Sequence, residues 1–540
     1  PMLYLLCNII CKSKIKSELL KINNNYVILK KNKNQMMRGY KLKKIFAVIG
    51  IIFLVIILVL NIGITAFLSP IEVVTICYNN IAYVFDLLLL VISIFLITNI
   101  INKFWYKNEK RKMLRKVLLI VVAIIYISAT IAFSILFKPS LKSDQKAVGI
   151  MAFCFNTKES DEPLEVEAYQ KLSIKEYMQA YNQQIPLAFM FSLFLKLIRS
   201  DDLYKLSIIN ILAIIAMIFA IRKIENMISK KYKTNKVLFY TLFFTFLSIP
   251  MLVTFKYGDL SSLTLSLFSV YYMMKFVETK KYKHILIASI FSMFAYMMRM
   301  NSLIFVIATV IYLLFVLFTK IKTKSAKEKI INVLTIIVYI GITIIPAKLV
   351  IAYYTNKYEL STEKQYPVAS YLLMAMEESN RANGWYNEGI AAPALKNPEK
   401  AKNEYPKLIK ERLEYFSENI GYAFRFYTLK IASMWTENTY SAVISNLTTL
   451  KDKLLEFEEP LLFYQKALLI LICISTIVVL IQNRKNLSPE IIYLLLIFMG
   501  GFAFHIIWEA KSRYIIPYIV VLIPLASIQI KTRKKQKTIP

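Results

Sequence analysis

Long apolar runs alternate with short polar segments along almost the whole chain. A helix rises about 1.5 Å per residue, so ~20 apolar residues cross the hydrocarbon core of a bilayer. The repeated pattern predicts an all-α polytopic membrane protein with about twelve transmembrane helices and two large extracytoplasmic loops containing interfacial helices. The predicted spans lie near residues 44–67, 82–102, 117–137, 205–221, 237–255, 260–278, 284–299, 301–319, 330–354, 461–482, 489–507 and 513–530.

One further apolar run, 185–199, is too short for length alone to decide whether it crosses. Basic loops favour the cytosolic side of a membrane, and this rule decides the ambiguity. If the amino terminus is inside and 185–199 does not cross, all the main basic segments fall on the cytosolic side. These segments are 103–116, 222–236, 279–283, 320–329, 483–488 and 531–540. We therefore expect 185–199 to lie along the outer interface or dip into it, and a short amphipathic helix within 163–180.

This topology divides the chain into a transmembrane core, an outer cap and two tails. Pro393, Pro398 and Pro406 are expected to divide the cap into short helices or loops. The predicted site would lie on the extracytoplasmic face of the cell membrane. The expected parts are a basic cytosolic tail or upstream extension at 1–43, the core at 44–354 with its outer loop 138–204, the cap at 355–460, C-terminal transmembrane helices at 461–530 and a basic cytosolic tail at 531–540.

Composition supports the membrane assignment and removes one class of partner. Of 540 residues, 57% are hydrophobic, and the mean hydropathy is +0.51. A net charge of +34 would suit a nucleic-acid-binding protein. However, the lysines and arginines cluster in the short loops between apolar runs, which is typical of cytosolic loops with an affinity for anionic membrane lipids. We therefore expect membrane lipids and no nucleic acid as partners.

Charged residues that immediately follow or precede predicted spans on the outer side are the candidates for chemistry. Asp144 and Gln145 follow the run that ends at Phe137, and a second acid, Asp259, follows the run 237–255. Arginine can grip a phosphate through its fork of donors and stays charged at physiological pH. The candidate residues at the other outer junctions are Tyr257, Arg299, Asn301, His505, Glu509, Lys511 and Arg513.

Each of these residues also has an ordinary structural explanation. An acid after a span is often a solvated loop residue, and Tyr257-Gly258-Asp259 can be a tight turn with a helix cap. Arginines at a boundary can be interfacial anchors, and His505 can be a packed polar side chain. The functional interpretation is favoured because two acids and three cations share one predicted face beneath two large loops.

Such a face suits sugar transfer from a polyprenyl-phosphate donor to an acceptor hydroxyl. The reaction needs a base for the acceptor and cations for the departing phosphate. Asp144 is the predicted general base, and Arg299, Lys511 or Arg513 would hold the phosphate. The sequence leaves open whether the acceptor is a cell-wall polymer, a lipid or an exported protein.

The order of these short motifs resembles bacterial C-type membrane glycosyltransferases, in particular the dolichyl-phosphate-mannose protein mannosyltransferase-like group. The resemblance covers roughly residues 40 to 530. The motifs are Asp144-Gln145, Tyr181-Asn182-Gln183-Gln184, Tyr257-Gly258-Asp259-Leu260, Arg299-Met300-Asn301, Gly384-Trp385-Tyr386-Asn387 and Trp508-Glu509-Ala510-Lys511-Ser512-Arg513-Tyr514.

The resemblance implies that Asp144 is the essential acid, with Gln145 beside it, and that Asp259 takes the second acidic position. Arg299 and Arg513 would contact the donor phosphate. Relatives often have Tyr-Pro-His-Gln where this chain has residues 181–184, so a histidine is missing there. Substrate hydrogen bonding by Tyr181 and Gln184 is therefore the role the resemblance leaves to this segment.

Two other classes of function remain open at this stage. A transporter or flippase of a lipid-linked glycan would place ionisable groups near the bilayer midplane. A non-catalytic partner in wall assembly would not need Asp144 or the arginines. No cofactor is required by the sequence, although Asp144 and Asp259 could together hold Mg²⁺ or Mn²⁺.

Overall fold

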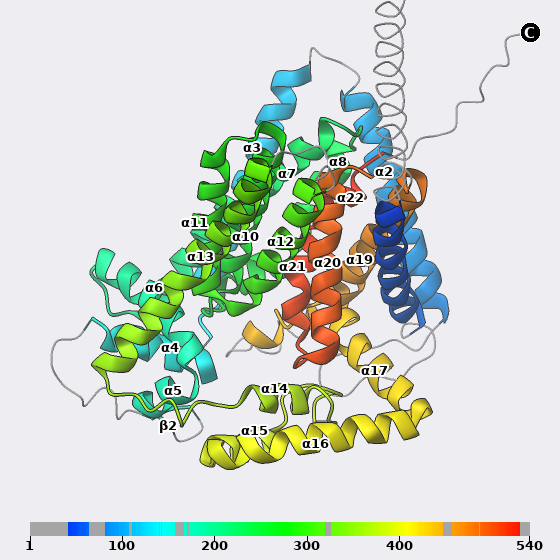
Figure 1. Cartoon of the computed structure of the whole chain (residues 1–540). Coiled ribbons are helices and arrows are strands. Elements are labelled where there is room, and N and C mark those ends of the chain that lie inside the picture. The colour runs from blue at the N-terminus through cyan, green and yellow to red at the C-terminus, as the bar shows by residue number, and fades with distance from the viewer. Residues whose placement is uncertain are drawn as a thin grey trace, which may run out of the picture.

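The protein is a bundle of long apolar helices with a layer of shorter helices at one end, seen in the computed structural model of Figure 1. Residues 1–40 and 530–540, which contain most of the two predicted basic tails, lie outside the described residues. The structure describes residues 41–63, 81–106, 111–139, 141, 143–156, 167–169, 172–318, 326–446, 456–484 and 487–529.

Nine helices within these ranges are long and apolar enough to cross a membrane. They support a multi-pass membrane protein, and they coincide with nine of the predicted runs. Their ranges are Lys41–Gly63, Ala82–Trp105 in α2 (Ile81–Tyr106), α3 (Lys112–Leu136), Leu203–Ser229 with α7 (Ser207–Ser229), Lys236–Thr254 with α8 (Lys236–Phe244), α9 (Ser248–Met251) and η5 (Leu252–Thr254), α10 (Asp259–Thr279), Ile330–Lys357 in α13 (Ala326–Lys357), α19 (Glu458–Asn483) and α20 (Pro489–Ile507).

Three of the twelve predicted spans are not long helices. Two are the shorter apolar helices α11 (Tyr282–Met298) and Met300–Val316, formed by η6 (Met300–Ser302) and most of α12 (Leu303–Phe318). The run 513–530 is broken into η9 (Ser512–Ile515), α21 (Ile516–Val520) and α22 (Ile523–Ala526). Prolines near the start of both α21 and α22 lack an N–H and disfavour a helical residue before them, which explains the breaks.

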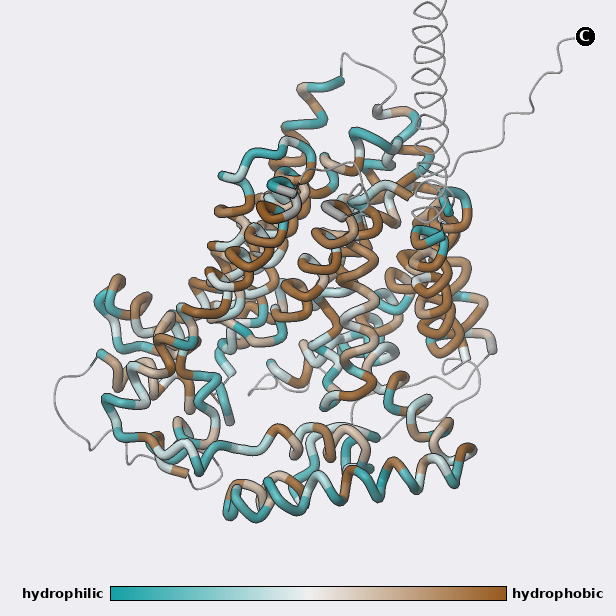
Figure 2. Tube along the Cα trace, in the orientation of Figure 1, coloured by the Kyte–Doolittle hydropathy of each residue, from teal (hydrophilic) through white to brown (hydrophobic). Residues whose placement is uncertain are grey.

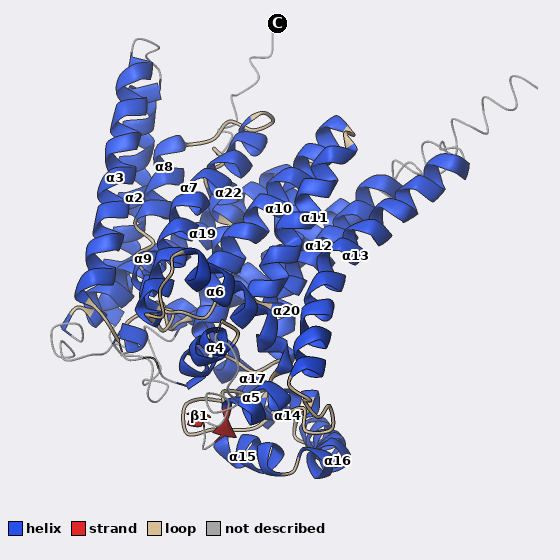
Figure 3. Ribbon diagram, turned by 90° about the vertical axis from the view of Figure 1, so that its left-hand side faces the viewer, coloured by secondary structure: helices blue, strands red, loops and turns tan. Residues whose placement is uncertain are grey.

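The bundle has two distinct ends. The connections between α7 and α8 and between α10 and α11 lie at the same end as the start of α3, as Figures 1 and 3 show. We call this the basic end, because Lys103, Arg222 and Lys230–Lys236 lie there. Figure 2 shows hydrophobic residues along the middle of the bundle, between this end and the helical layer at the other. The basic segments that the structure describes therefore gather at one end, as the sequence predicted.

Backbone and side-chain contacts hold the basic end together. The Asn235 N–H donates to the Ser527 carbonyl over 2.7 Å, and the Gln529 N–H donates to the Lys233 carbonyl over 2.8 Å. Glu490, 4% exposed, pairs with Lys231 at 2.7 Å. These contacts join the α7–α8 connection to the end of α22 and to the start of α20, so the last short helices are fixed at the basic end.

Helices α19 and α20 form the centre of the bundle. Within the apolar window of each, 72% of residues are buried, against 17% in α2 and 11% in α3. Large apolar side chains of α3 such as Ile125 and Ile135 are exposed. In a soluble protein this surface would be costly, whereas in a bilayer it contacts lipid.

The run 185–199 forms α6 (Ile185–Leu197), which begins after η3 (Asn182–Gln184). It packs against α4 (Ser143–Cys154), α11 and α13. Residues 207–229 then run from the helical-layer end to the basic end. The chain therefore does not change ends at α6, which agrees with the prediction from charge.

The second end carries a layer of helices that we call the cap. Its helices are α14 (Val368–Met374), α15 (Glu388–Lys396), α16 (Pro398–Glu418) and α17 (Ile420–Trp435). A short antiparallel pair, β1 (Glu167–Tyr169) and β2 (Leu172–Ser173), leads into α5 (Ile174–Ala180), with Glu167 opposite Ser173. Among the described residues of 163–180, the expected helix is α5, which forms the last seven residues of that range.

The prediction that three prolines divide the cap was correct only for Pro398, which begins α16. Pro393 lies inside α15, and Pro406 lies inside α16. Pro406 has no N–H to donate to the Lys402 carbonyl. Both residues are exposed, so water can donate that hydrogen bond instead. The helix therefore continues through Pro406.

Candidate functional site

Asp144 lies in the first turn of α4 at the cap end of the bundle. The Tyr177 hydroxyl donates to its Oδ1 over 2.9 Å, whereas Oδ2 takes no hydrogen bond from any residue that the structure describes. The positive end of the α4 dipole favours a negative charge at this position. One carboxylate oxygen is thus held by Tyr177 while the other can accept a proton.

Gln145 connects Asp144 to the segment that precedes α10. Its Oε1 accepts a hydrogen bond from the Lys256 N–H over 2.8 Å. Asn210 supports the same segment, because its Nδ2 donates to the Val253 and Phe255 carbonyls, each over 2.9 Å. The position of α4 is therefore coupled to residues 253–259.

Gly258 makes the turn that places Tyr257 and Asp259. Its φ is +80°, in the left-handed region where residues other than glycine are strained. A Cβ atom at this position would lie 2.4 Å from the Met298 carbonyl oxygen. The turn therefore needs glycine both for its conformation and for the close approach of the α11 end.

Gly258→Ala should lower the free energy of unfolding by roughly 1–3 kcal/mol, because it forces a strained conformation and a backbone clash. The matched control is Gly421→Ala, since a Cβ there meets nothing within 4 Å and the residue lies in α17. Thermal unfolding of both variants in detergent measures the difference. Equal midpoints for the two variants would contradict the prediction.

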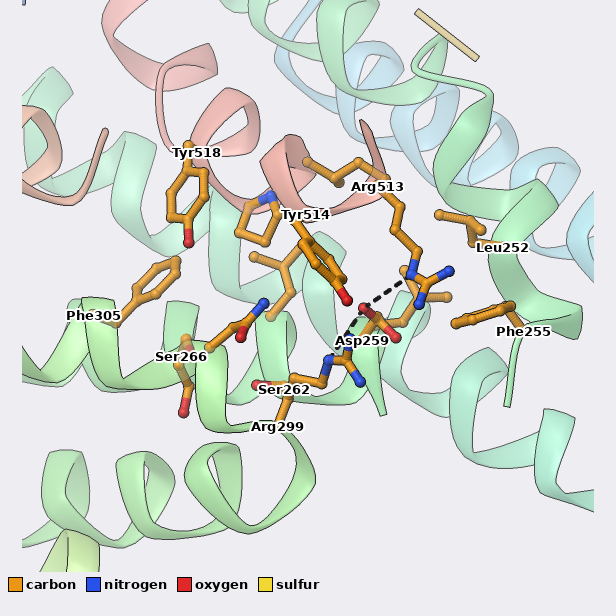
Figure 4. Close-up of a pocket in the computed structure, with 16 residues that line it drawn as sticks. Leu252, Phe255, Asp259, Ser262, Ser266, Arg299, Phe305, Arg513, Tyr514 and Tyr518 are labelled. Atoms are coloured by element: carbon orange, nitrogen blue, oxygen red, sulfur yellow. Dashed lines mark ion pairs between the residues drawn. The ribbon is translucent and has the colours of Figure 1, made fainter. Parts of the chain in front are cut away.

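Asp259 stands between two arginines that come from distant parts of the chain. Its Oδ1 lies 3.5 Å from Nε of Arg299 and 3.9 Å from Nε of Arg513, the contacts dashed in Figure 4. Both distances are longer than that of a typical N–H···O hydrogen bond. Among the described residues, Asp259 Oδ2 and Arg513 Nε are buried without a hydrogen-bond partner. The arginines are therefore held near Asp259 with donor capacity left over.

Aromatic rings orient both guanidinium groups. The Arg299 guanidinium carbon lies 4.2 Å from the centre of the Tyr257 ring. The Arg513 guanidinium carbon lies 4.3 Å from the centre of the Phe255 ring. The centre of the Tyr514 ring lies 5.4 Å from the Arg299 guanidinium carbon and 5.3 Å from that of Arg513, so this ring contacts both arginines. Cation–π contacts of this kind hold the guanidinium planes without using their hydrogen-bond donors.

The charge of Asp144 acts on Arg299 and on Lys511. Burial alone would lower the pKa of Arg299, but the Asp259 carboxylate raises it, and Asp144 adds to the increase. Burial also lowers the pKa of Lys511, but the nearby Glu509 carboxylate raises it. The net effect is a raised pKa, to which Asp144 also contributes. Asp144, Arg299 and Lys511 therefore belong to one electrostatic environment.

The segment after α20 joins this environment to the cap. Lys511 Nζ lies 3.1 Å from Glu509 Oε1, and the Ala510 N–H donates to the Gly384 carbonyl over 2.8 Å. Trp508 stacks on Tyr371 of α14 with ring centres 5.2 Å apart. The cap is thus fastened directly to the segment that carries the cations.

Lys430 and His505 are buried next to this segment. Lys430, fully buried, donates to the Ala375 and Ile506 carbonyls over 2.7 and 2.8 Å. Burial lowers the pKa of Lys430 to about 7, although Glu509 opposes the shift. His505 is fully buried on α20 and stacks against Tyr514 with ring centres 5.6 Å apart. We therefore assign His505 to the support of Tyr514.

Residues 181–184 face the cap and not the arginines. The Tyr181 ring packs against Tyr177 and Tyr366, at 4.9 and 5.4 Å between ring centres. The Gln184 N–H donates to the Tyr181 carbonyl, and Gln184 is the residue from which α6 begins. This segment therefore forms an edge beside Asp144, connected to it through Tyr177.

A narrow cavity of about 40 Å³ adjoins the two arginines. Its polar side is formed by Asp259, Arg299, Asn301 and Arg513, and its far side is largely apolar. Figure 4 shows Arg299 and Arg513 directed toward Asp259, with Phe305 and Tyr518 further along. The apolar part of the lining includes Leu260, Leu263, Phe305, Ile516, Pro517 and Tyr518. The cavity therefore leads from a cationic mouth toward the interior of the bundle.

The residues around Asp259 do not fit a divalent metal ion. Mg²⁺ and Mn²⁺ need several oxygen ligands, and two guanidinium groups beside Asp259 would repel a cation. Within the described ranges, no group of three or more His, Cys, Asp or Glu side chains could hold a metal. The option of a metal shared by Asp144 and Asp259 therefore receives no support from the geometry.

Two important contacts were not anticipated from the sequence. Tyr177, which holds Asp144, lies in a segment where only an amphipathic pattern was visible. Tyr514, whose ring contacts both Arg299 and Arg513, was identified from the sequence only as part of a motif. No signal in a single sequence would identify either contact, because both depend on the packing of distant segments.

Comparison with known proteins adds no identification. No protein-family model matches the chain, and no curated protein matches it in sequence.

Proposed function

We propose that this protein is a membrane glycosyltransferase that moves a sugar from a polyprenyl-phosphate donor to an acceptor hydroxyl at the cap end of the bundle. One observation carries the proposal. A carboxylate with an oxygen available as a base, Asp144, shares its electrostatic environment with Arg299, which lines a largely apolar cavity together with Arg513, whose buried Nε has no partner among the described residues.

Arg299 and Arg513 are better suited to bind a phosphate than to pair permanently with the Asp259 carboxylate. A buried donor without a partner costs free energy, and the phosphate oxygens of a lipid donor would satisfy Arg513 Nε and the terminal nitrogens of both arginines. The apolar lining beyond Arg299 gives the first isoprenoid units a path away from water. Asp259 would then keep the two guanidinium groups in place when the donor leaves.

The proposed reaction balances as a displacement at the anomeric carbon. Asp144 Oδ2 takes the proton of the acceptor hydroxyl, and the acceptor oxygen forms a bond to the anomeric carbon. The bond between that carbon and the phosphate oxygen breaks, and its electron pair leaves with the polyprenyl phosphate. Arg299 and Arg513 stabilise the negative charge that develops on the phosphate. Tyr177, through Asp144 Oδ1, orients the carboxylate.

The cap explains how water could be kept from the donor. Trp508, Tyr371 and Tyr366 form a continuous aromatic contact between the α20 end and α14. Excluding water strengthens the interactions of Asp144 and the arginines with the reacting groups. The resemblance of the motifs to C-type membrane glycosyltransferases supports the same activity.

The proposal is tested with membranes or proteoliposomes that contain the purified full-length chain and an undecaprenyl-phosphate sugar with a radioactive sugar moiety. The expected result is label covalently attached to an acceptor fraction, with release of undecaprenyl phosphate. If the label crosses the membrane but stays on its lipid, the protein is a transporter and the proposal is wrong. Absence of both outcomes with a panel of hexose donors would also contradict it.

A further inference from the structure

A second cavity lies at the cap end and is lined in part by Lys256, in the segment that precedes α10. Its volume is about 220 Å³, larger than the cavity beside Arg299. It lies between the end of α3, the start of α7 and η4 (Leu203–Leu206), which leads into α7. The two cavities share no lining residue: Phe255 and Asp259 line the first, and Lys256 lines the second.

Three lysines and one carboxylate line this second cavity. Lys138 and Lys205 are exposed at its opening, and Lys256 is only 2% exposed. Asp202 is the one acidic residue of the lining, and its Oδ1 accepts a hydrogen bond from the Tyr204 N–H over 2.9 Å. The lining therefore carries an excess of positive charge, part of which is removed from solvent.

Lys256 is held in a way that leaves it short of a counter-ion. Its Nζ donates to the Thr254 carbonyl over 3.1 Å and lies 5.0 Å from the centre of the Tyr204 ring. Burial lowers the pKa of Lys256 to about 8, with Asp202 opposing the shift. No carboxylate among the described residues lies within ion-pair distance of Lys256, so its buried ammonium group lines the cavity with only the longer-range influence of Asp202.

Apart from Ser134, Ser207 and Tyr204, the rest of the lining is apolar, and part of it belongs to the lipid-facing surface. Ile131 and Ile135 of α3 and Ile208 of α7 line the cavity while being 38%, 63% and 40% exposed. A headgroup could therefore enter from the side, with its acyl chains resting on these isoleucines. A soluble ion would make no use of this apolar wall.

We propose that this cavity binds the phosphate of an anionic membrane lipid, with Lys256 at its base and Lys138 and Lys205 at its opening. Lysine is a suitable phosphate ligand because its compact charge does not demand a fixed geometry. The site lies at the cap end, away from the basic loops that attract anionic lipids in general. It does not depend on the proposed glycosyltransferase activity.

The test uses the full-length chain in phosphatidylcholine vesicles that contain a small fraction of phosphatidic acid with a photoreactive diazirine. After irradiation, mass spectrometry locates the modified residues. We expect modification within residues 131–138 and 204–211. Each of Lys138→Ser and Lys205→Ser should lower it roughly fivefold, and Lys256→Met at least as much. The matched control is Lys196→Ser, because Lys196 is an exposed lysine of α6 outside the cavity.

If Lys256→Met does not fold, the variants of the two exposed lysines still decide the question. Modification confined to other segments, or an equal loss in Lys196→Ser, would show that no specific site exists. Unlabelled phosphatidic acid should compete with the probe, whereas excess inorganic phosphate should not. Equal competition by inorganic phosphate would overturn the lipid assignment, since the cavity would then recognise a soluble anion.

Discussion

Asp144→Asn should reduce sugar transfer by roughly 10²–10⁴-fold, the usual contribution of a general base. The substitution keeps the side-chain shape and leaves an Oδ1 atom that can still accept the Tyr177 hydrogen bond. It removes only the ability to take a proton. Initial rates of transfer from the radioactive donor, measured at saturating donor, test this prediction.

Two further measurements separate a chemical effect from a folding effect. Thermal unfolding of Asp144→Asn should match that of the native protein, and binding of the intact donor should persist. Asp201→Asn is a suitable control, because Asp201 is an exposed carboxylate that follows α6 and contacts none of the site residues described above. Full transfer activity in Asp144→Asn would remove Asp144 from the role of base.

Arg299→Gln should lower kcat/KM for the donor by roughly 10–100-fold, since a hydrogen bond to a charged group contributes about 1.5–3 kcal/mol. Arg299→Lys should recover part of this loss, because lysine restores the charge but not the planar fork of donors. The side chain of Arg299 is 11% exposed and lies at the cavity mouth, so its loss cannot be replaced by solvent. Steady-state kinetics over a range of donor concentrations measures both effects.

A matched arginine distinguishes phosphate binding from a general effect of charge. Arg199 is exposed, follows α6, and does not line the cavity. Arg199→Gln should leave kcat/KM for the donor unchanged. If Arg299→Gln and Arg199→Gln behave alike, the two arginines at Asp259 do not bind the donor, and the proposed orientation of the lipid phosphate is wrong.

The sequence predicted the helical membrane architecture because span length and loop charge are both local properties. The same reasoning correctly predicted that α6 does not carry the chain from one end of the bundle to the other. It did not show that Pro517 and Pro524 break the run 513–530 into short helices, although that run still passes from the cap end to the basic end. Proline is tolerated in many transmembrane helices, so its presence in an apolar run does not decide between a kinked span and a broken one.

The candidate site could be predicted as a set of residues but not as an arrangement. Asp144, Asp259, Arg299 and Arg513 were assigned to one face from their positions at span ends, and the structure does bring them to the cap end. The sequence left Asp259 free to be a metal ligand. Its neighbours Arg299 and Arg513 change this interpretation, because only tertiary structure shows that they converge on one carboxylate.

The contribution of Arg513 has a consequence for how the protein matures during synthesis. The site combines α4, the Tyr257–Asp259 turn and η9, which lies close to the last described residue of the chain. During synthesis, the helices that carry Asp259 and Arg299 would therefore be inserted before Arg513 and Tyr514 have been made. Binding of the proposed donor should thus appear only after residues 512–515 have left the ribosome, because Arg513 and Tyr514 are made long after Asp259 and Arg299.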